Sequence, residues 1–294
     1  MHGPGSIKVV AMKRTLLIFL VLSTLRAAWP TSAQADAAAS GGPALLQRIS
    51  VYEPTYFLPA YYSFSPDNAV YGNTLPNGQN LNRLEVKFQI SFKVAMASSG
   101  LAKSVYAAYT QRSYWQFYRD SAFFRETNYQ PELLVAPDNR WNLGAGWDIG
   151  FRVSPYVHQS NGRGGSLERS WNRTCADLIF ERLDAGGDGW EADLRAWVVW
   201  RDPAYRRYNP DLAYYLGHFR PSVTYKRGPW ELSVVLHNQL ESAFRRGSVE
   251  ASVSHYLGDN WSLYAQYFNG HGQSLIEYNH STTALGVGFA LRTR

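Results

Sequence analysis

Hydrophobic and polar residues alternate one by one along much of this 294-residue chain. In the longest uninterrupted run, Leu84–Val94, every even position is apolar and every odd position is Glu, Lys, Gln or Ser. This period of two predicts a β-strand with one apolar and one polar face, long enough to cross a bilayer as a tilted strand. Similar runs predict further strands at Trp141–Val153, Asn172–Phe180, Asp193–Trp200, Trp230–Asn238, Val249–Leu257, Trp261–Phe268 and Ala284–Leu291.

These strands are predicted to form one antiparallel sheet, because turn-forming segments such as Asp184–Gly189 and Leu257–Asn260 separate several of them. No segment has the spacing of an amphipathic helix, and no shift of composition marks a second domain. At roughly 20 residues for a strand and its connection, the chain holds on the order of a dozen strands. We therefore expect an all-β fold, an antiparallel transmembrane β-barrel over residues 81–294, preceded by an extended segment at residues 36–80.

A soluble β-sandwich or a lipocalin-like barrel is the alternative fold. In such folds the polar face of each strand meets the solvent and the aromatic face fills a core. A long strand with Lys and Glu on one face suits a wide, polar lumen better, and 20 Tyr, 14 Phe and 10 Trp residues fit the aromatic girdles of a membrane barrel. Asp184–Trp190 resembles a calcium-binding repeat, but a single copy between two strands predicts a hairpin turn instead.

The first 35 residues have the three parts of a secretory signal peptide. Lys13 and Arg14 are basic, Thr15–Leu25 is apolar, and Ala33–Ala35 is a small-x-small cleavage site, so the mature chain is expected to begin near Asp36. A membrane anchor is the alternative, but the apolar run is shorter than the roughly 20 residues that a spanning helix needs. We therefore expect an exported protein.

Charge and cysteine content exclude several classes of function. The net charge is +6, and the basic residues of the signal segment account for four of these charges, which leaves about +2 on the mature chain. Because no Lys/Arg cluster occurs elsewhere, we expect no nucleic-acid partner. Cys175 is the single cysteine, so an intramolecular disulfide and a cysteine-based metal site are excluded. No Gly-x-Ser-x-Gly motif occurs, which argues against an α/β-hydrolase.

The segment from His158 to Asn172 carries the candidate chemistry. His158 and Ser160 occupy positions i and i+2 of a predicted strand and therefore project from the same face. The glycine-rich sequence that follows can turn the chain, so that a second antiparallel strand brings Asn172 beside His158. A base, a nucleophile and a neutral orienting group are the parts of an acyl-transfer site. Because a His-x-Ser spacing is common by chance, the alternative is a polar strand end followed by a surface loop.

Neighbouring strand positions predict that these side chains lie on the outer wall of the barrel. Pro155 can introduce a bulge, after which Tyr156, His158 and Ser160 share one face. The positions that face the same way as Asn172 become increasingly apolar along its strand, at Thr174, Ala176, Leu178 and Phe180. A carboxylate on a lipid-facing wall is costly, which explains a neutral orienting residue. Because Asn stabilises an imidazolium less than Asp does, a cation such as calcium is expected to supply positive charge to the oxyanion.

His158–Arg163 followed by Arg169–Arg173 resembles the active-site signature of outer-membrane phospholipase A. Further blocks in the same order resemble that family, at residues 85–89, 109–111, 124–129, 209–211 and 272–279. The resemblance implies a twelve-stranded barrel in the bacterial outer membrane. It also implies calcium-dependent hydrolysis of glycerophospholipid acyl esters, as a phospholipase A1, phospholipase A2 and lysophospholipase that is active as a homodimer.

The resemblance also assigns catalytic roles by motif. It implies that Ser160 is the nucleophile, that His158 is the general base and acid, and that Asn172 orients His158. The backbone amide of Gly162 is implied to donate a hydrogen bond to the oxyanion.

The implied calcium site and dimer contact involve other residues. The carbonyl of Arg163 matches the ligand from one subunit, Ser121 matches the ligand from the other, and Gln111 matches a polar residue buried at the dimer interface. The family's calcium-binding serine is Glu168 in this chain, four residues before the catalytic Asn. A carboxylate can replace a hydroxyl as a calcium ligand, but Glu168 can equally pair with Arg169 or repel a substrate phosphate.

Two further functions stay open at this point. A porin or adhesin would keep the strand pattern but would not need the His, Ser and Asn block. A barrel deacylase or acyltransferase acting on lipid A is the nearest enzymatic alternative.

Overall fold

The computed structural model describes residues 48–292, so the expected signal peptide at residues 1–35 lies outside the described residues. Within that range, twelve strands pair with antiparallel neighbours in a closed barrel. Their bounds are β2 (Tyr56–Ser63), β3 (Leu84–Ala95), β4 (Val105–Trp115), β5 (Phe124–Val135), β7 (Trp147–Ser160), β8 (Ser170–Leu183), β9 (Gly189–Trp200), β10 (Phe219–Arg227), β11 (Trp230–His237), β12 (Ser248–Tyr256), β13 (Trp261–His271) and β14 (Ser281–Leu291). Two shorter strands pair beside this ring, β1 (Ile49–Val51) with β3 and β6 (Trp141–Gly144) with β7.

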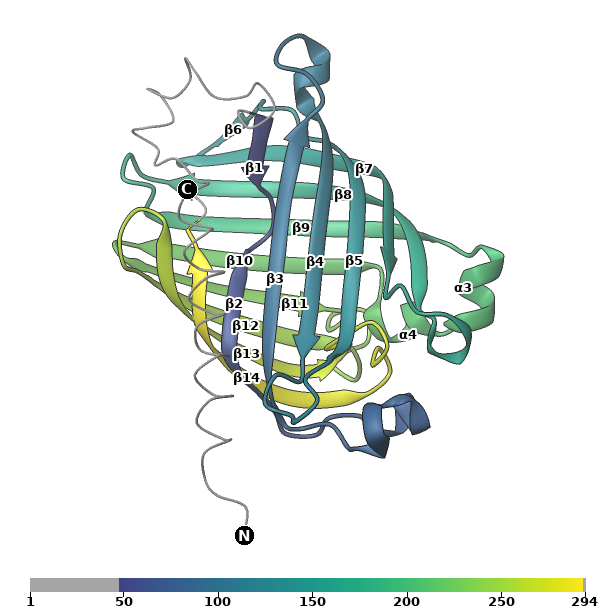
Figure 1. The fold of residues 1–294 in the computed structure, drawn as a ribbon. Helices are drawn as coiled ribbons and strands as arrows, with labels where there is room; N and C mark the ends of the chain where they lie inside the picture. The colour runs from purple at the N-terminus through teal and green to yellow at the C-terminus, as the bar shows by residue number, and fades with distance from the viewer. Residues whose placement is uncertain (1–47, 293–294) are drawn as a thin grey trace. The chain divides into compact units, whose positions relative to one another are not determined.

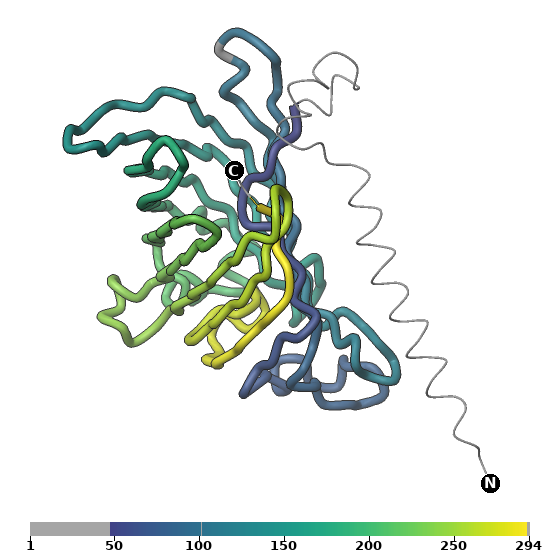
Figure 2. The backbone as a smooth tube through the Cα atoms, turned by 90° about the vertical axis from the view of Figure 1, so that its left-hand side faces the viewer, coloured from purple at the N-terminus to yellow at the C-terminus, as the bar shows by residue number. Residues whose placement is uncertain are grey.

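The barrel closes where its first and last strands meet. β14 pairs with β2 through partners such as Val287 and Ala60, and β2 pairs in turn with β3. The purple β2 lies beside the yellow β14 in both views (Figure 1, Figure 2). Closure gives every strand two neighbours, which a sheet inside a bilayer needs because no water is present there to bond an open edge. The expected antiparallel, twelve-stranded barrel is confirmed.

Two predicted boundaries differ from the structure. The segment 36–80, expected to precede the barrel, contains β2, which pairs on both sides with barrel strands. This strand is apolar at nearly every position, and the register shifts near Pro59, so no clear alternation reveals it. The expected strand Trp141–Val153 is instead the β6–β7 hairpin, because Gly144, Ala145 and Gly146 take positive φ values and form a turn.

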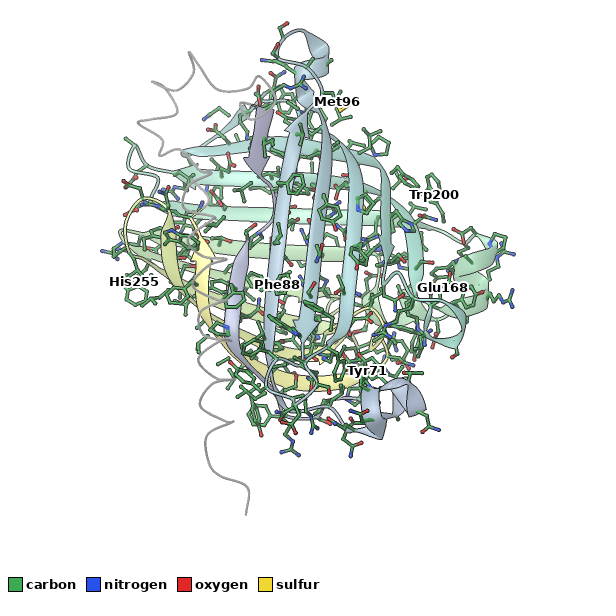
Figure 3. All side chains as sticks on the ribbon, viewed as in Figure 1. Tyr71, Phe88, Met96, Glu168, Trp200 and His255 are labelled. Atoms are coloured by element: carbon green, nitrogen blue, oxygen red, sulfur yellow. The ribbon has the colours of Figure 1, made fainter. Side chains whose placement is uncertain are left out.

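The alternation of β3 separates a polar lumen from an apolar outer surface. Lys87 is 1% exposed and Glu85 1%, whereas Ile90 on the opposite face is 47% exposed. Figure 3 places Phe88 on this strand. In a membrane barrel the exposed apolar face contacts lipid, so the buried polar face must find hydrogen-bond partners inside the barrel.

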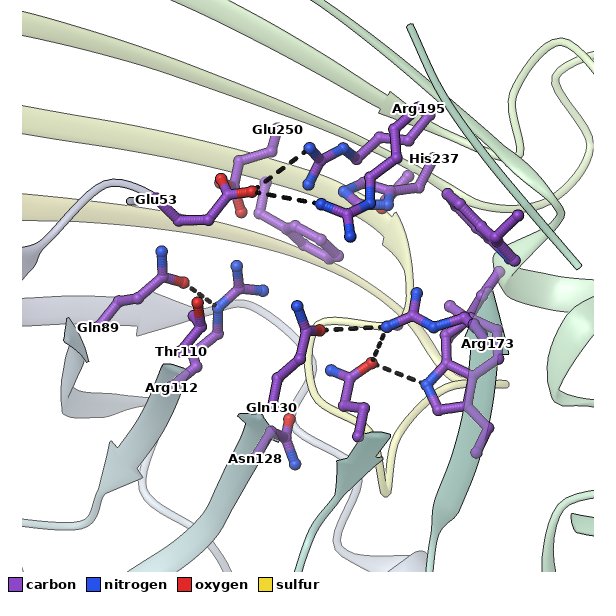
Figure 4. A pocket seen from close by; sticks show the side chains of 18 residues that line it. Glu53, Gln89, Thr110, Arg112, Asn128, Gln130, Arg173, Arg195, His237 and Glu250 are labelled. Carbon is purple, nitrogen blue, oxygen red and sulfur yellow. Dashed lines mark hydrogen bonds and ion pairs between the residues drawn. The ribbon is translucent and has the colours of Figure 1, made fainter. Parts of the chain in front are cut away.

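Ion pairs and hydrogen bonds fill the lumen. Arg195 of β9 binds Glu132 of β5 at 2.7 Å, and Arg125 of β5 binds Glu85 of β3 at 2.8 Å. Such side chains, including Glu53, Arg112, Arg173, Arg195 and Glu250 (Figure 4), line a cavity of about 140 Å³. The interior is therefore crossed by paired charges, in agreement with the polar lumen predicted from the sequence.

Two short helices follow β9, α3 (Pro203–Tyr208) and α4 (Leu212–Leu216). They lie at the end of the barrel where β7 turns into β8 (Figure 1). Single 3-10 turns occupy other connections, η2 (Ala69–Thr74), η3 (Pro76–Gly78), η4 (Leu101–Ser104) and η5 (Gly165–Leu167). None of the helices within residues 48–292 is long and apolar enough to span a membrane.

Candidate active site

A β-bulge in β7 turns the candidate catalytic residues outward. Ser154 pairs with Cys175 of β8, but Val157 pairs with Arg173, so three steps along β7 match two steps along β8. The extra residue falls next to Pro155, whose missing N–H is tolerated in a bulge. After the bulge Val157 is fully buried on the lumen side, and the even-numbered residues of β7 face outward. The bulge expected at Pro155 is present.

The structure brings His158 and Asn172 together. They are direct partners across β7 and β8, which places both side chains on the outward face. The imidazole Nδ1 of His158 lies 2.8 Å from Oδ1 of Asn172. Because a carbonyl oxygen only accepts, this contact requires the proton on Nδ1 and leaves Nε2 of the imidazole free to accept a proton.

Ser160 ends β7, two residues beyond His158 on the same outward face. Its Oγ accepts a hydrogen bond of 3.0 Å from the backbone N–H of Gly162. Gly162 has a φ of 64°, and a Cβ at this position would lie 3.1 Å from Cε2 of Tyr129. Among the described residues no hydrogen bond joins Ser160 to His158, although contacts of this kind often form only when substrate binds. The glycine amide therefore points at the hydroxyl that is expected to react.

The loop between β7 and β8 is held by Asn161. Its Oδ1 accepts from the backbone N–H groups of Arg163 and Arg169, at 3.3 and 3.0 Å, and its Nδ2 donates to the carbonyl of Leu167 at 2.8 Å. Asn161 is buried, so it bonds both sides of the loop from within. The asparagine between Ser160 and Gly162 thus fixes the backbone that presents the hydroxyl and the amide.

Glu126 of β5 anchors the same loop to the barrel wall. Its buried carboxylate accepts from Nε of Arg163 at 3.1 Å, from Nδ2 of Asn128 at 2.9 Å and from the backbone N–H of Ile276 at 3.2 Å. Residues 124–129 and 272–279, two of the blocks that resemble the family, therefore meet behind the candidate site.

A third block, residues 209–211, also contacts this region. Asn209 accepts the backbone N–H of Ser170 at 2.9 Å, and Asp211 accepts the hydroxyl of Tyr278. Burial, and then this hydrogen bond, raises the pKa of the Tyr278 phenol, so the phenol keeps its proton and the contact.

Asn172 has two further partners that the sequence reasoning missed. The hydroxyl of Tyr156 donates to its Oδ1 at 3.1 Å, and its own Nδ2 donates to Oδ2 of Asp202 at 2.8 Å. Asp202 precedes Pro203 and is the N-cap of α3. An Asp-Pro pair is a recognisable helix start in a sequence, but its contact with Asn172 depends on how β8 pairs with β9.

The predicted calcium ligands lie in loops. Glu168 follows η5 in the β7–β8 loop (Figure 3), and Ser121 is exposed in the loop between β4 and β5. Within the described residues the Glu168 carboxylate makes no hydrogen bond or ion pair, while the guanidinium of Arg169 donates to the carbonyls of Ser166 and Glu168. Within residues 48–292, no group of three or more His, Cys, Asp or Glu side chains is arranged so that it could hold a metal ion.

Gln111 lies on the outward face of β4, opposite Tyr129 of β5. Its Oε1 accepts from the hydroxyl of Tyr109 at 2.9 Å, and its Nε2 donates to Ser113 at 3.1 Å. A hydrogen-bonded amide on an otherwise apolar outer wall is unusual, because lipid offers it no partner.

Comparisons with known proteins identify the family. The family model for phospholipase A1 matches residues 36–291. Phospholipase A1 of Klebsiella pneumoniae is 33% identical over 244 residues, which are 82% of this chain and 81% of the relative.

Solved structures agree with the sequence comparison. The dimer of outer membrane phospholipase from Salmonella typhi, with bound calcium, is 31% identical, with a TM-score of 0.72 over 82% of this chain and 91% of that one. An active-site mutant of outer membrane phospholipase A from Escherichia coli, with an asparagine changed to alanine, is 28% identical, with a TM-score of 0.75 over 87% and 96%. The chain belongs to the phospholipase A1 family, and it is an outer-membrane β-barrel enzyme.

Proposed function

We propose that the protein hydrolyses acyl esters of glycerophospholipids with Ser160, His158 and Asn172 as its catalytic residues. The observation that carries the proposal is the 2.8 Å contact between His158 and Asn172 on the outward face, beside Ser160. A site on this face meets the acyl ester where the lipid lies. It needs no passage of substrate into the lumen.

The proposed reaction begins when Nε2 of His158 takes the hydroxyl proton of Ser160. Oγ of Ser160 attacks the ester carbonyl, and the backbone N–H of Gly162 donates to the oxyanion that forms. The imidazolium then gives its proton to the departing lysophospholipid oxygen. Water then attacks the acyl-serine and gives a proton to the same nitrogen. The imidazolium returns this proton to Oγ of Ser160 as the fatty acid is released. Oδ1 of Asn172 accepts a hydrogen bond from Nδ1–H of His158 throughout. This bond keeps Nε2 directed at the reacting atoms.

Calcium fits the oxygen donors near the site. Arg163 offers a backbone carbonyl that accepts no hydrogen bond from the described residues, and Glu168 offers a carboxylate that is likewise without a hydrogen bond or ion pair within residues 48–292. Hard oxygen ligands of this kind suit Ca²⁺. We propose that these two residues hold the ion together with Ser121 of the partner subunit. Bound calcium would supply positive charge beside the oxyanion.

A homodimer follows from this ligand set, because one subunit alone lacks the third ligand. The related Salmonella typhi protein is a dimer with bound calcium, and Gln111 offers a polar group on the outer wall that a partner subunit could cover. The porin alternative is less well supported, since ion pairs such as Arg195–Glu132 and Arg125–Glu85 cross the lumen.

The test is acyl release from phosphatidylcholine in detergent micelles by the refolded, purified protein. We expect Ser160→Ala to abolish release and the control Ser254→Ala, a buried serine of β12, to retain it. Equal release by S160A and wild type would refute the mechanism. Chelation of calcium is expected to abolish both acyl release and the dimer detected by cross-linking. Release that survives chelation would contradict the calcium proposal and leave the triad standing.

A further inference from the structure

The carboxylate of Asp202 accepts hydrogen bonds from two different groups. Oδ1 accepts the backbone N–H of Tyr205 at 2.8 Å, which caps α3, and Oδ2 accepts Nδ2 of Asn172 at 2.8 Å. Asn172 is paired across the sheet with Trp200, so Asp202 lies just beyond the strand end that flanks the candidate triad. The chain Asp202–Asn172–His158 is therefore continuous through hydrogen bonds of 2.8 Å each.

Asp202 is the only partner of Asn172 in this cluster that can accept but not donate. If the Asn172 amide were turned over, its Oδ1 would face the ionised carboxylate with no proton between them. The other two partners do not resist that inversion. The hydroxyl of Tyr156 can accept instead of donate, and Nδ1 of a neutral His158 can accept when the proton sits on Nε2.

The inverted amide would put the proton of His158 on the wrong nitrogen. With the proton on Nε2, that nitrogen has no lone pair to take the hydroxyl proton of Ser160, and a triad held in that tautomer is a poor catalyst. The direction of the amide therefore decides whether the base can work.

We propose that Asp202 is a positioning residue that fixes the amide of Asn172 and thereby the catalytic tautomer of His158. The inference rests on the triad proposed above. The arrangement also accounts for a neutral residue at position 172. It keeps the negative charge one hydrogen bond away from the outer wall, in a half-buried loop position, where a carboxylate costs less than on a lipid-facing strand.

The first test is a double-mutant cycle between Asp202→Ser and Asn172→Ala. Serine is a good N-cap, so D202S keeps the cap of α3, but its side chain is too short to reach Asn172. We expect D202S to lower kcat by at least about tenfold, the loss expected for one hydrogen bond to a charged group, with KM within about twofold. In the N172A background, D202S is expected to lower kcat by less than about twofold, because the residue through which Asp202 acts is absent. Equal losses in both backgrounds, or none, would overturn the proposal.

The matched control is Asp188→Ser. Asp188 is a loop carboxylate that also accepts a backbone N–H, that of Gly228 at 2.9 Å, and it lies in the β8–β9 connection far along the strands from Asn172. D188S is expected to keep wild-type kcat. A loss in D188S equal to that in D202S would mean that removing any loop carboxylate disturbs the enzyme.

The second test exchanges the two groups and does not depend on the behaviour of D202S. Asn172→Asp alone would place two carboxylates in direct contact, so one must stay protonated or move away, and we expect kcat to fall by about tenfold or more. Adding Asp202→Asn restores an amide-to-carboxylate hydrogen bond with the partners reversed, and it is expected to recover at least about fivefold of that loss. No recovery in N172D/D202N would overturn the proposal.

The controls separate this inference from the proposed function. If S160A releases acyl chains as wild type does, the triad itself is wrong. If S160A is inactive while D202S is fully active, the triad stands and the role of Asp202 is refuted.

Discussion

Replacing Arg125 by Met is expected to destabilise the barrel strongly. Arg125 is 1% exposed and joins three parts of the chain. Its guanidinium binds both carboxylate oxygens of Glu85 on β3, at 2.8 and 2.9 Å, and Glu277 in the β13–β14 connection at 2.7 Å. A further bond of 3.1 Å reaches the hydroxyl of Tyr71 in η2.

The expected loss of free energy of unfolding follows from the two carboxylates that lose their partner when Met replaces Arg125. Two buried carboxylates lose their cation, and breaking a buried pair by removing one partner costs about 3–5 kcal/mol. That is a large share of a total stability of about 5–15 kcal/mol. By contrast, the exposed pair of Lys103 and Asp138, 3.5 Å apart, is worth about 0–1 kcal/mol, so Lys103→Met is the matched control.

The assay is urea unfolding of the refolded protein in detergent micelles, followed by the fluorescence of its ten tryptophans. We expect R125M to lower the free energy of unfolding by several kcal/mol and K103M to leave it nearly unchanged. The triple variant R125M/E85Q/E277Q, which removes all three charges, is expected to recover much of the loss. An R125M protein whose free energy of unfolding is less than about 1 kcal/mol below that of wild type would contradict a stabilising role for the ion pairs of Arg125 with Glu85 and Glu277.

Three further outcomes are expected. Gly162→Ala should lower kcat by about fivefold or more. A φ of 64° costs a non-glycine residue about 1 kcal/mol, and the new Cβ would lie 3.1 Å from Tyr129. An unchanged kcat would contradict a role for the Gly162 amide in stabilising the oxyanion. Glu168→Ser should change the calcium concentration that gives half-maximal acyl release, and an identical calcium titration would exclude Glu168 as a ligand. Deletion of Val157 should shift the rest of β7 by one position and turn His158 toward the lumen, opposite Arg173, so that acyl release is lost while the folded barrel still resists heat and detergent on a gel. An active deletion variant would contradict the need for His158 to face outward.

The fold could be predicted wherever lumen and lipid impose opposite polarity on one strand. β3 shows this, because Glu85 and Lys87 face inward and Ile90 faces outward. β2 does not, because aromatic residues also fill the lumen. Tyr61 is fully buried, and the ammonium group of Lys87 lies 4.7 Å from the centre of its ring. Because tyrosines of β2 face the lumen as well as the lipid, this strand lacks the alternation of apolar and polar residues on which the prediction relied.

The candidate site could be inferred from the sequence as far as its residues lie close together along the chain. His158 and Ser160 lie on one strand, so the strand period places them on one face. Asn172 lies across a single hairpin, whose pairing brings it opposite His158. Asp202 lies 30 residues beyond Asn172 and reaches it only through the pairing of β8 with β9 and the start of α3. No local pattern encodes such a contact, since it depends on the register of two strands and on a loop conformation together.

The outward direction of His158 and Ser160 also determines which measure of substrate concentration sets the velocity of the enzyme. If this face is catalytic, as proposed, it encounters esters by lateral diffusion within one leaflet and returns both products to the same layer. Its velocity should then follow the mole fraction of phospholipid in the surrounding film rather than the amount in bulk solution. Diluting the film with an inert detergent at constant total phospholipid should slow the reaction. The outward face of β7 beyond its bulge thus makes the membrane both the solvent and the source of substrate in the proposed reaction.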